Sequence, residues 1–340
     1  MSGTRLPAGQ RPASHPNVMS PIFWKDDRVV MLDQRLLPHE EVWTAYDTVE
    51  DVARSIRDME VRGAPAIGCA AAFGAALAMR QRPSVLQLRE YFRMLRDTRP
   101  TAVNLAAALH RMSNAIAAGR DTAVEAQALW LEDLNACRAI GENGAALLPD
   151  QGTVLTHCNA GALATAGYGT ALGVIRGAVA AGKKINVLCD ETRPFMQGAR
   201  LTSWELTQDG IEAEVIVDGA AAHFLSRGAI AAVVVGADRI ASNGDCCNKI
   251  GTLGVAAAAF AFGVPFYVAA PTTTLDPRTA TGTAIPIEDR AAEEITMVGG
   301  RRITPEGVGV RNPVFDVTPH RFVTAIVTEA GVHRPPYHFV

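Results

Sequence analysis

Apolar residues in the first 150 positions recur mainly at helical spacing. Between residues 48 and 60 they stand at Val49, Val52, Ala53, Ile56 and Met59, and this spacing predicts an amphipathic helix. Further helices are expected over residues 66–79, 85–95, 102–118 and 121–148. A strand of an early hairpin is expected over residues 29–37. The first part of the chain is therefore predicted to be mainly helical.

From residue 150 onward, short apolar runs alternate with helical patterns. Strands are expected over residues 153–156, 186–190, 214–217, 232–235, 265–269 and 322–327. Helices are expected over residues 162–181, 198–208, 220–227 and 253–262. Strands that alternate with helices imply right-handed crossovers and a mostly parallel sheet. Residues 277–320 lack such a pattern and are expected to be irregular.

The change from a helical pattern to alternating strand and helix patterns near residue 150 predicts an α/β chain with two domains. A turn at residues 149–152 (PDQG) marks the boundary, so the first domain is expected over residues 21–149 and the second over residues 150–340. Residues 1–20 begin with a segment rich in Gly, Pro, Ser and Arg that lacks the apolar core of a signal peptide. We expect this segment to be a disordered tail.

Composition narrows the classes of function. The chain has 340 residues, of which 48% are hydrophobic and 20% charged, and a net charge of -3. This balance lacks the basic excess that a nucleic-acid-binding surface needs. Two uncharged stretches, residues 63–79 and 250–275, are Ala-rich or interrupted by Pro265, so they predict buried helices rather than membrane spans. We expect a cytoplasmic protein that binds neither nucleic acid nor membrane.

Six cysteines are present, and their spacing matches neither a redox pair nor a zinc site. Most are expected to be reduced and buried, and no metal is predicted. Cys158 is the exception, because it follows the strand predicted over residues 153–156. Ligands bind at the carboxyl ends of strands in open α/β sheets. The helix predicted from residue 162 would also point the positive end of its dipole at this thiol.

Two later strand ends carry further candidate groups. Asp238 follows the strand predicted over residues 232–235, where a carboxyl group could act as an acid or base or could simply cap a loop. Asn248 and Lys249 precede a predicted helix, and together with its N-terminus they indicate an anion site. Gln197 belongs to a polar cluster, DETRPFMQG, after the strand predicted over residues 186–190.

Two segments of the helical part fit a phosphate group. Arg62, Gly63 and Ala64 precede Pro65, and such a loop can offer backbone N–H groups beside a guanidinium, although an ordinary helix–helix turn has the same composition. Arg99 in the RPT segment is a weaker instance of the same arrangement. The GYGTALG segment at residues 167–173 lacks the spacing of a dinucleotide fingerprint. The candidate groups therefore indicate a site for a small phosphorylated ligand without a cofactor.

Seven strings carry a family resemblance: RGAPAIG, RPTAVNL, THCNAG, ETRPFMQGARLT, GADRI, NKIGT and NPVFDVTP. In this order, from about residue 50 to residue 330, they resemble the methylthioribose-1-phosphate isomerases of methionine salvage. That family is similar in fold to the regulatory subunits of translation initiation factor 2B and to ribose-1,5-bisphosphate isomerase. The resemblance implies an N-terminal helical domain, a Rossmann-like C-terminal domain and a homodimer.

The resemblance also assigns roles to single residues. The catalytic Cys and Asp of the family match Cys158 and Asp238. The family's phosphate and substrate contacts match seven residues: Arg62, Gly63, Ala64, Arg99, Gln197, Asn248 and Lys249. Cys246 and Cys247 depart from the pattern, because relatives usually carry other small residues there.

The implied reaction converts an aldose 1-phosphate into a ketose 1-phosphate. Alternative substrates in the same class are 5-deoxyribose 1-phosphate and ribose 1,5-bisphosphate, and the sequence does not locate the pocket that would choose among them. A different class, a non-catalytic regulatory subunit like those of initiation factor 2B, also stays open. The presence of both Cys158 and Asp238 argues against that class.

Overall fold

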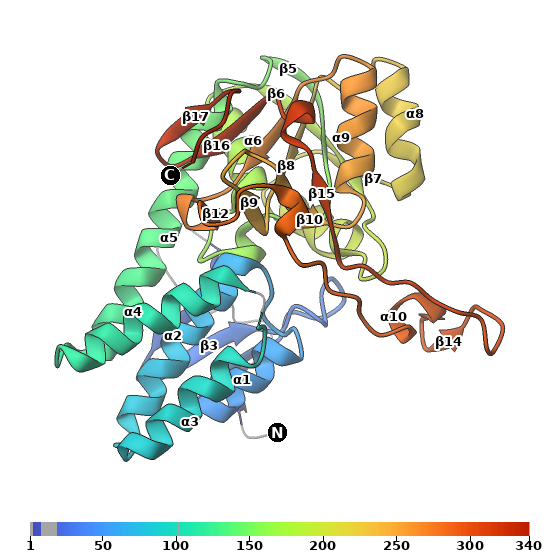
Figure 1. The fold of residues 1–340 in the computed structure, drawn as a ribbon. Helices are drawn as coiled ribbons and strands as arrows, with labels where there is room; N and C mark the ends of the chain where they lie inside the picture. Colours follow the sequence, from blue (N-terminus) through green and yellow to red (C-terminus); the bar gives the residue numbers. More distant parts are fainter. Residues whose placement is uncertain (1–2, 8–18, 101, 340) are drawn as a thin grey trace. The chain divides into compact units, whose positions relative to one another are not determined.

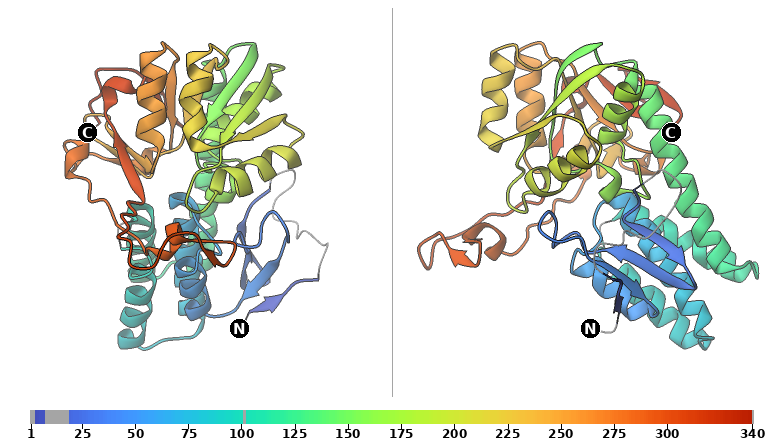
Figure 2. Two further views of the ribbon diagram at one scale, coloured as in Figure 1. Left: turned by 90° about the vertical axis from the view of Figure 1, so that its right-hand side faces the viewer. Right: turned by 180° about the vertical axis from the view of Figure 1, so that it is seen from behind.

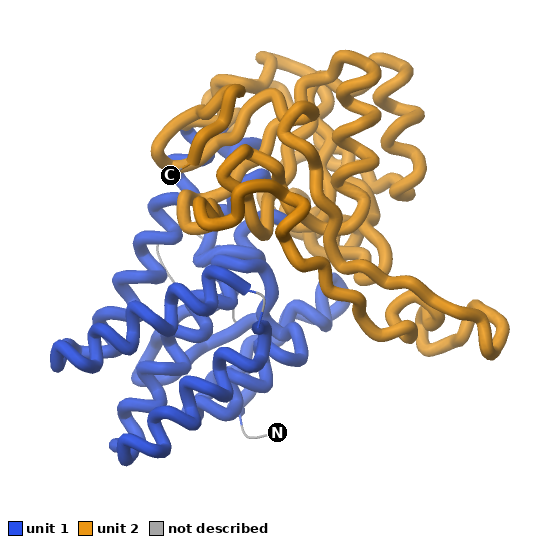
Figure 3. Tube along the Cα trace, in the orientation of Figure 1, with its two compact units in different colours: residues 1–142, 160–177 blue, residues 143–159, 178–340 orange. Residues whose placement is uncertain are grey.

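A computed structural model of the chain describes residues 3–7, 19–100 and 102–339. Figure 3 shows two compact units. Unit 1 contains the described residues up to Glu142 and the segment Ala160–Gly177, and unit 2 contains Asn143–Asn159 and the described residues from Ala178 onward. The units thus differ from the domains predicted at residue 150, because the segment 160–177 groups with the helical unit.

Contacts with helix α5 (Thr122–Ala145) explain why this segment belongs to unit 1. The N–H of Ala166 donates to Asp133 at 2.7 Å. Gly141 faces the backbone of Gly173 so closely that an added Cβ would lie 2.7 Å from its carbonyl oxygen. These contacts are tertiary, and no local pattern in the sequence predicts them.

Five helices dominate unit 1 and confirm the helical prediction for this part of the chain (Figure 1). They are α1 (Val49–Arg57), α2 (Ala64–Arg80), α3 (Val85–Arg96), α4 (Val103–Ala117) and α5 (Thr122–Ala145). Thr48 and Ser84 cap α1 and α3 by accepting a backbone N–H from the first turn. Helix α2 is buried almost throughout, as its small side chains allow. Among the described residues, no helix is long and apolar enough to cross a membrane.

Unit 1 also contains a small antiparallel sheet that the sequence predicted only in part. Its strands, in spatial order, are β1 (Thr4–Arg5), β4 (Trp43–Tyr46), β3 (Arg28–Leu32) and β2 (Ile22–Lys25). The predicted strand over residues 29–37 ends at Leu32. Asp26 and Asp27 form the two-residue turn of the expected hairpin, with φ of 49° and 62°. The predicted tail, residues 1–20, contains β1, while residues 1–2 and 8–18 lie outside the described residues.

A seven-stranded sheet forms the core of unit 2. Its spatial order is β17 (Gly331–His333), β16 (Ala325–Thr328), β11 (Phe266–Ala269), β8 (Ala232–Val235), β5 (Gln151–Thr156), β6 (Lys184–Asp190) and β7 (Ala213–Ile216). All neighbouring pairs are parallel except β16 with β17. Without β17, the strands follow the order 3-2-1-4-5-6 of a Rossmann sheet. In this order, successive strands are added on one side of β5 up to β7 and on its other side from β8 onward, so the strand order reverses between β5 and β8. The predicted mostly parallel sheet is confirmed.

Two helices, α8 (Ala221–Ser226) and α9 (Thr252–Ala261), lie side by side in unit 2 (Figure 2). Their buried residues Leu225, Val255 and Ala259 share one apolar cluster with Val233 and Phe266 of the central strands. These contacts bury one side of the sheet. Helix α7 (Ser203–Gln208) follows a π-helical turn, η2 (Gly198–Thr202), which the sequence predicted as ordinary helix.

The helix predicted over residues 162–181 is wrong in its first half. A single 3-10 turn, η1 (Ala162–Ala164), is followed by a loop, and helix α6 (Ala171–Ala180) begins only afterwards. Gly167 and Gly169 have φ of 152° and 83°, which other residues rarely adopt. An added Cβ at Gly169 would lie 2.5 Å from the backbone of Gly161. These glycines therefore serve a tight loop, not the close packing of a helix.

The prediction of irregular structure over residues 277–320 holds for most of this segment, but residues 315–318 form a strand of a second sheet in unit 2. Its order is β12 (Leu275–Asp276), β9 (Arg239–Ala241), β10 (Cys246–Lys249) and β15 (Phe315–Thr318). Between β12 and β15 the chain forms α10 (Glu293–Thr296) and a ribbon of β13 (Met297–Val298) with β14 (Arg301–Arg302). This ribbon projects from the rest of unit 2 (Figures 1 and 2).

Candidate active site

Cys158 and Asp238 follow neighbouring strands of the parallel sheet. Cys158 comes two residues after β5 and Asp238 three residues after β8. The two strands are paired through Leu155 and Val233 at the point where the strand order reverses. Ligands of such sheets bind outside the carboxyl ends of the strands at this point. The fold therefore places both predicted catalytic residues at the position where a Rossmann sheet binds its ligand.

The backbone of Cys158 is held in an unusual conformation. Its φ is 65°, in the left-handed region that residues with a Cβ seldom occupy. Its N–H donates to the hydroxyl of Thr192 at 2.8 Å, and its carbonyl accepts from the hydroxyl of Thr202 at 2.6 Å. The residue is buried, with 7% of its surface exposed. Strained backbone of this kind persists where the surroundings fix it, and it is concentrated at functional sites.

No α-helix begins directly after the Cys158 turn. The sequence predicted that a helix from residue 162 would direct its dipole at the thiol, but α6 begins at Ala171. The two Thr hydroxyls, not a helix N-terminus, satisfy the backbone around the thiol. The predicted dipole effect on the thiol is therefore wrong for this helix.

His157, next to the thiol, is a buried residue that the sequence did not single out. Its Nδ1 lies 2.8 Å from Oδ2 of Asp190, and its Nε2 lies 2.8 Å from the carbonyl oxygen of Ile250. Burial lowers the pKa of His157, but the hydrogen bond and the charge of Asp190 outweigh it and raise the pKa above its ordinary value. His157 thus connects the ends of β5 and β6 with the turn between β10 and α9.

His157, Asp190 and Asp218 have the donor set of a possible metal site, because one potential ligand atom from each lies within 4.8 Å of the others. The observed hydrogen bonds favour another role. A carbonyl oxygen only accepts, so the contact with Ile250 requires a proton on Nε2, while Nδ1 faces Asp190. Both carboxylate oxygens of Asp218 accept backbone N–H groups, one from Thr192 and the other from Arg193. The cluster therefore resembles a hydrogen-bonded support for the Cys158 turn.

Asp238 is half-buried and lies in a region of charged neighbours. Its N–H donates to the carbonyl of Cys247 at 2.9 Å. Burial, with the charges of Asp238 and Asp316, raises the pKa of the Cys247 thiol to about 12. Cys247 is therefore a neutral, small group beside the Asp238 carboxyl group at neutral pH. Arg239, the residue after Asp238, pairs with Asp276 at 3.7 Å.

Asn248 and Lys249 are buried at the end of strand β10, and as predicted they precede a helix, α9. Nδ2 of Asn248 donates to the hydroxyl of Thr252 at 3.0 Å. Nζ of Lys249 donates to the carbonyl of Val314 at 3.0 Å and lies 4.9 Å from the centre of the Phe315 ring. The burial of Lys249 is compatible with a site for an anion, because a buried cation is stabilised by a negative partner.

The N-terminus of α9 is already occupied by a carboxylate of the protein. Asp316 accepts the N–H of Gly251 at 2.8 Å and that of Leu253 at 3.1 Å. Burial raises the pKa of Asp316, against the effect of these two hydrogen bonds and of the neighbouring His157 and Lys249. The predicted anion site at this helix N-terminus is therefore corrected. Asp316, which sequence reasoning missed, fills it by a long-range contact.

Gln197 precedes the π-helical turn and is 9% exposed. Its Oε1 is buried and has no hydrogen-bond partner in the structure. Buried polar atoms nearly always have partners, and an exception calls for an explanation such as a ligand. This orphaned oxygen is compatible with the predicted substrate contact of Gln197.

The remaining predicted contacts belong to unit 1. Gly63 has φ of 93° and an added Cβ would lie 2.4 Å from the carbonyl oxygen of Ala164, so only glycine fits. It precedes α2, whose first turn has neither a side-chain cap nor an acidic residue. Arg62 and Arg99 are half-buried, and Thr101 of the predicted RPT motif lies outside the described residues. The α2 N-terminus is thus uncapped, and phosphate binding by this loop stays a prediction.

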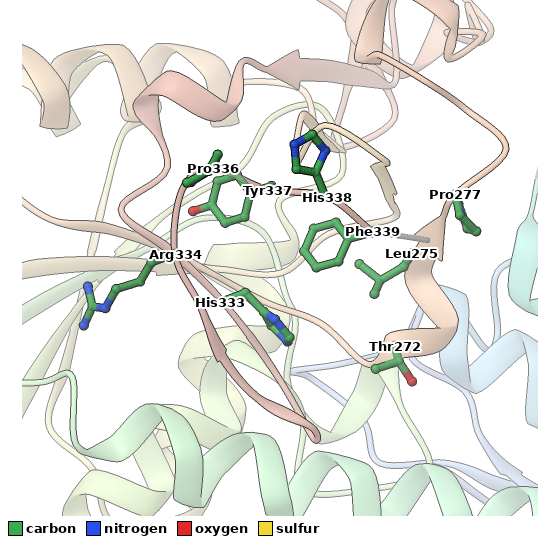
Figure 4. Close-up of a pocket in the computed structure, with 9 residues that line it drawn as sticks. All are labelled: Thr272, Leu275, Pro277, His333, Arg334, Pro336, Tyr337, His338 and Phe339. Carbon is green, nitrogen blue, oxygen red and sulfur yellow. The ribbon is translucent and has the colours of Figure 1, made fainter.

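A separate pocket of about 710 Å³ lies in unit 2, near the end of the chain (Figure 4). Its lining residues come from the β11–β12 region and the C-terminal segment, and none is a predicted site residue: Thr272, Leu275, Pro277, His333, Arg334, Pro336, Tyr337, His338 and Phe339. The rings of Tyr337 and Phe339 stack with their centres 6.0 Å apart.

Comparisons with known proteins agree with the geometry. The Initiation factor 2 subunit family model matches residues 60–335. Over 336 residues, the chain is 53% identical to a methylthioribose-1-phosphate isomerase of Koribacter versatilis, with 94% of this chain and 95% of the relative covered.

Two solved structures are also similar over 94% of this chain. One is a 5-methylthioribose 1-phosphate isomerase from Pyrococcus horikoshii OT3, with a TM-score of 0.89, 42% identity and 94% of that chain covered. The other, from A. fulgidus, is described as translation initiation factor eIF-2B, subunit delta, with a TM-score of 0.84, 44% identity and 97% of that chain covered. By the extent and identity of these matches, the chain belongs to the methylthioribose-1-phosphate isomerases within the Initiation factor 2 subunit family.

Proposed function

We propose that this chain is an aldose–ketose isomerase that converts 5-methylthioribose 1-phosphate into 5-methylthioribulose 1-phosphate in methionine salvage. The observation that carries the proposal is the pair Cys158 and Asp238 at the ends of neighbouring strands, at the reversal point of the sheet. The names of the relatives support the same reaction.

The substrate explains why the reaction needs an acid. The phosphate is attached to the anomeric oxygen, so the ring cannot open as a free hemiacetal does. In the proposed mechanism the carboxyl group of Asp238 donates a proton to the ring oxygen while the bond between C1 and O4 breaks. A carboxyl group can hold such a proton at neutral pH when its surroundings disfavour the charged form. The half-buried position of Asp238, beside the neutral thiol of Cys247, is compatible with this role.

Hydrogen must then move from C2 to C1, and two balanced routes lead to the ketose. In one, the Cys158 thiolate removes the C2 proton to give an enol phosphate, which is reprotonated at C1 as the C2 hydroxyl loses its proton. In the other, the C2 hydrogen moves to C1 as a hydride, and Cys158 takes the hydroxyl proton. A substrate with deuterium at C2 separates the routes, because full retention of deuterium at C1 excludes exchange with solvent.

The resemblance predicts substrate contacts in each unit. In unit 2, Lys249 and Asn248 of strand β10 are proposed to contact the substrate. In unit 1, Arg62, Arg99 and the Gly63–Ala64 loop are proposed as phosphate contacts. We also propose that the enzyme is a homodimer, and light scattering would test this by returning twice the mass of the chain.

Steady-state kinetics on three sugars test the proposed function. We expect kcat/KM to be highest for 5-methylthioribose 1-phosphate and at least about tenfold lower for 5-deoxyribose 1-phosphate and ribose 1,5-bisphosphate. One missing apolar group in a pocket is typically worth ~10–200-fold. A higher kcat/KM with either alternative sugar would reassign the substrate within the same reaction class.

A second candidate function is that of a non-catalytic regulatory subunit, because the similar A. fulgidus structure is described as a subunit of a translation initiation factor. Assays of turnover and of partner binding distinguish the two functions. An absence of turnover with all three sugars, together with tight binding to a translation-factor partner, would support the regulatory subunit and contradict the isomerase.

Gln197→Met gives a test of a single substrate contact. Methionine has a similar shape but no amide, so we expect KM to rise about tenfold, the equivalent of ~1.4 kcal/mol. The melting temperature should stay the same or rise, because the variant removes a buried oxygen that has no partner. The matched control is Gln208→Met, at an exposed position on α7, which should change neither quantity. An unchanged KM in the Gln197 variant would remove this residue from the site.

A further inference from the structure

His157 is a buried titratable residue beside the proposed catalytic thiol, and the mechanism above does not use it. Its two ring nitrogens contact groups on different parts of unit 2, namely Asp190 at the end of β6 and Ile250 between β10 and α9. The residue is 1% exposed and Asp190 is 0% exposed. A ring in this position can hold these two parts of the chain at a fixed distance from each other.

The hydrogen bonds around His157 reach both halves of the proposed site. Asp190 is linked to Cys158 as well as to His157. Its carboxylate contacts His157, and its backbone carbonyl accepts a hydrogen bond from the hydroxyl of Thr192. The same hydroxyl accepts the N–H of Cys158. On the other side, Ile250 directly follows Lys249, and its N–H donates to the carbonyl of Val314 at 3.0 Å. The ring is thus the link between the turn of Cys158 and the turn of Lys249.

We propose that His157 is a positioning residue: as an imidazolium, it bridges the Asp190 carboxylate and the Ile250 carbonyl and so fixes Cys158 relative to Lys249. This role rests on the proposed function, in which the thiol moves a proton and Lys249 binds the substrate. A neutral ring cannot make both contacts with an ionised Asp190, because the bond to Ile250 uses its only N–H.

The charges that face the ring favour its protonated form. Three acids approach it, namely Asp190 on β6, Asp218 on the turn after β7, and Asp316 on β15. Burial raises the pKa of Asp190 above its ordinary value, and the hydrogen bond and charge of His157 oppose this rise, so the imidazolium stabilises the ionised form of this carboxyl group. Because the pKa of His157 is raised in the folded protein, the bridge is complete below the ordinary value of about 6.5 and is lost as the pH rises through the raised value.

Nitrogen NMR on protein labelled with ¹⁵N-histidine tests the bridge without any substrate. The signals of His157 are those that disappear in the His157→Gln variant. We expect both ring nitrogens to be protonated at pH 7 and to stay so above the pH at which an ordinary histidine loses its proton. A ring with a single N–H at pH 7 would overturn the proposal, whether or not the protein isomerises the sugar.

Two substitutions of His157 separate its contacts in kinetics. The amide of Gln can reach the position of Nε2, so His157→Gln keeps the bond to Ile250 and loses that to Asp190; we expect kcat to fall about 10- to 100-fold with little change in KM. The amide of Asn can reach the position of Nδ1, so His157→Asn keeps the contact with Asp190, and we expect KM to rise. The alkaline decline of kcat that depends on His157 should vanish in both variants. Wild-type kinetics and an unchanged pH profile in both would contradict the proposal.

A third variant displaces the ring without changing it. An added Cβ at Gly251 would lie 2.7 Å from Cε1 of His157, so Gly251→Ala should lower kcat and alter the His157 signals. Gly263→Ala is the matched control, because Gly263 also has positive φ and its Cβ would meet nothing within 4 Å. Retention of the wild-type imidazolium signals in Gly251→Ala would show that the ring is not held where the structure places it. A wild-type protein inactive on all three sugars would refute the proposed function alone, since the NMR result stands independently.

Discussion

Asp238→Asn and Cys158→Ser are each expected to lower turnover by ~10²–10⁴-fold, the usual contribution of a general acid or base. Asparagine has the shape of the carboxyl group but cannot donate its proton to the ring oxygen. Serine keeps the position of the thiol, but its hydroxyl is a far weaker acid, so it provides almost no anionic base at neutral pH. Steady-state assays with 5-methylthioribose 1-phosphate measure both effects.

The controls for this pair separate chemistry from folding. Cys137→Ala removes another buried thiol, on helix α5 of unit 1, and should leave kcat close to the wild-type value. Circular dichroism should show native secondary structure in both site variants, since each substitution keeps the size of the side chain. If either variant keeps more than about a tenth of the wild-type turnover, that residue has no role as acid or base.

The second large effect is expected at Gly198, in the π-helical turn that follows Gln197. An alanine Cβ at this position would lie 1.7 Å from the carbonyl oxygen of Asp190, so the backbone must move. The contact is between rigid groups, and we expect Gly198→Ala to lower the free energy of unfolding by about 3 kcal/mol, the upper end of ordinary overpacking. At ~2–4 °C per kcal/mol, the melting temperature should fall by about 6–12 °C.

The same substitution should also reduce activity, because the Asp190 carbonyl that it displaces accepts the hydroxyl of Thr192, which holds the N–H of Cys158. Gly219→Ala is the matched control, since an added Cβ there meets nothing within 4 Å. Its effect on stability should stay within about 0.5 kcal/mol. A Gly198→Ala protein with native melting temperature and native kcat would show that the turn is looser than the structure indicates.

The sequence predicted most of the elements that position the site. Helical spacing and short apolar runs identified α1 to α5 and the six parallel strands, because burial on one face or on both leaves a period in the sequence. It also placed Cys158 and Asp238 at strand ends, since each follows its apolar run within three residues. The strand β4 and the sheet containing β9, β10 and β15 were not predicted, because their strands are short and three of them are partly polar.

Two of the predictions that failed concerned the start of a helix. The loop before α6 is set by Gly169 against Gly161, and an Ala-rich sequence gives no sign of that contact. The N-terminus of α9 was expected to bind an anion, and Asp316 occupies it from a position 65 residues later in the chain than Gly251. Such long-range contacts depend on packing, which a local window of sequence does not contain.

By itself, the sequence determined which groups are available: a thiol and a carboxyl group after two apolar strands, with basic residues and small loops to bind a phosphorylated ligand. Only the tertiary structure decided that the two strands, β5 and β8, are neighbours at the reversal point of the sheet. It also decided that His157 meets both Asp190 and Ile250, 33 and 93 residues away in the chain. The physical reason is that periodicity records the burial of each element, whereas the pairing of strands and the partners of buried polar groups follow from how the elements pack.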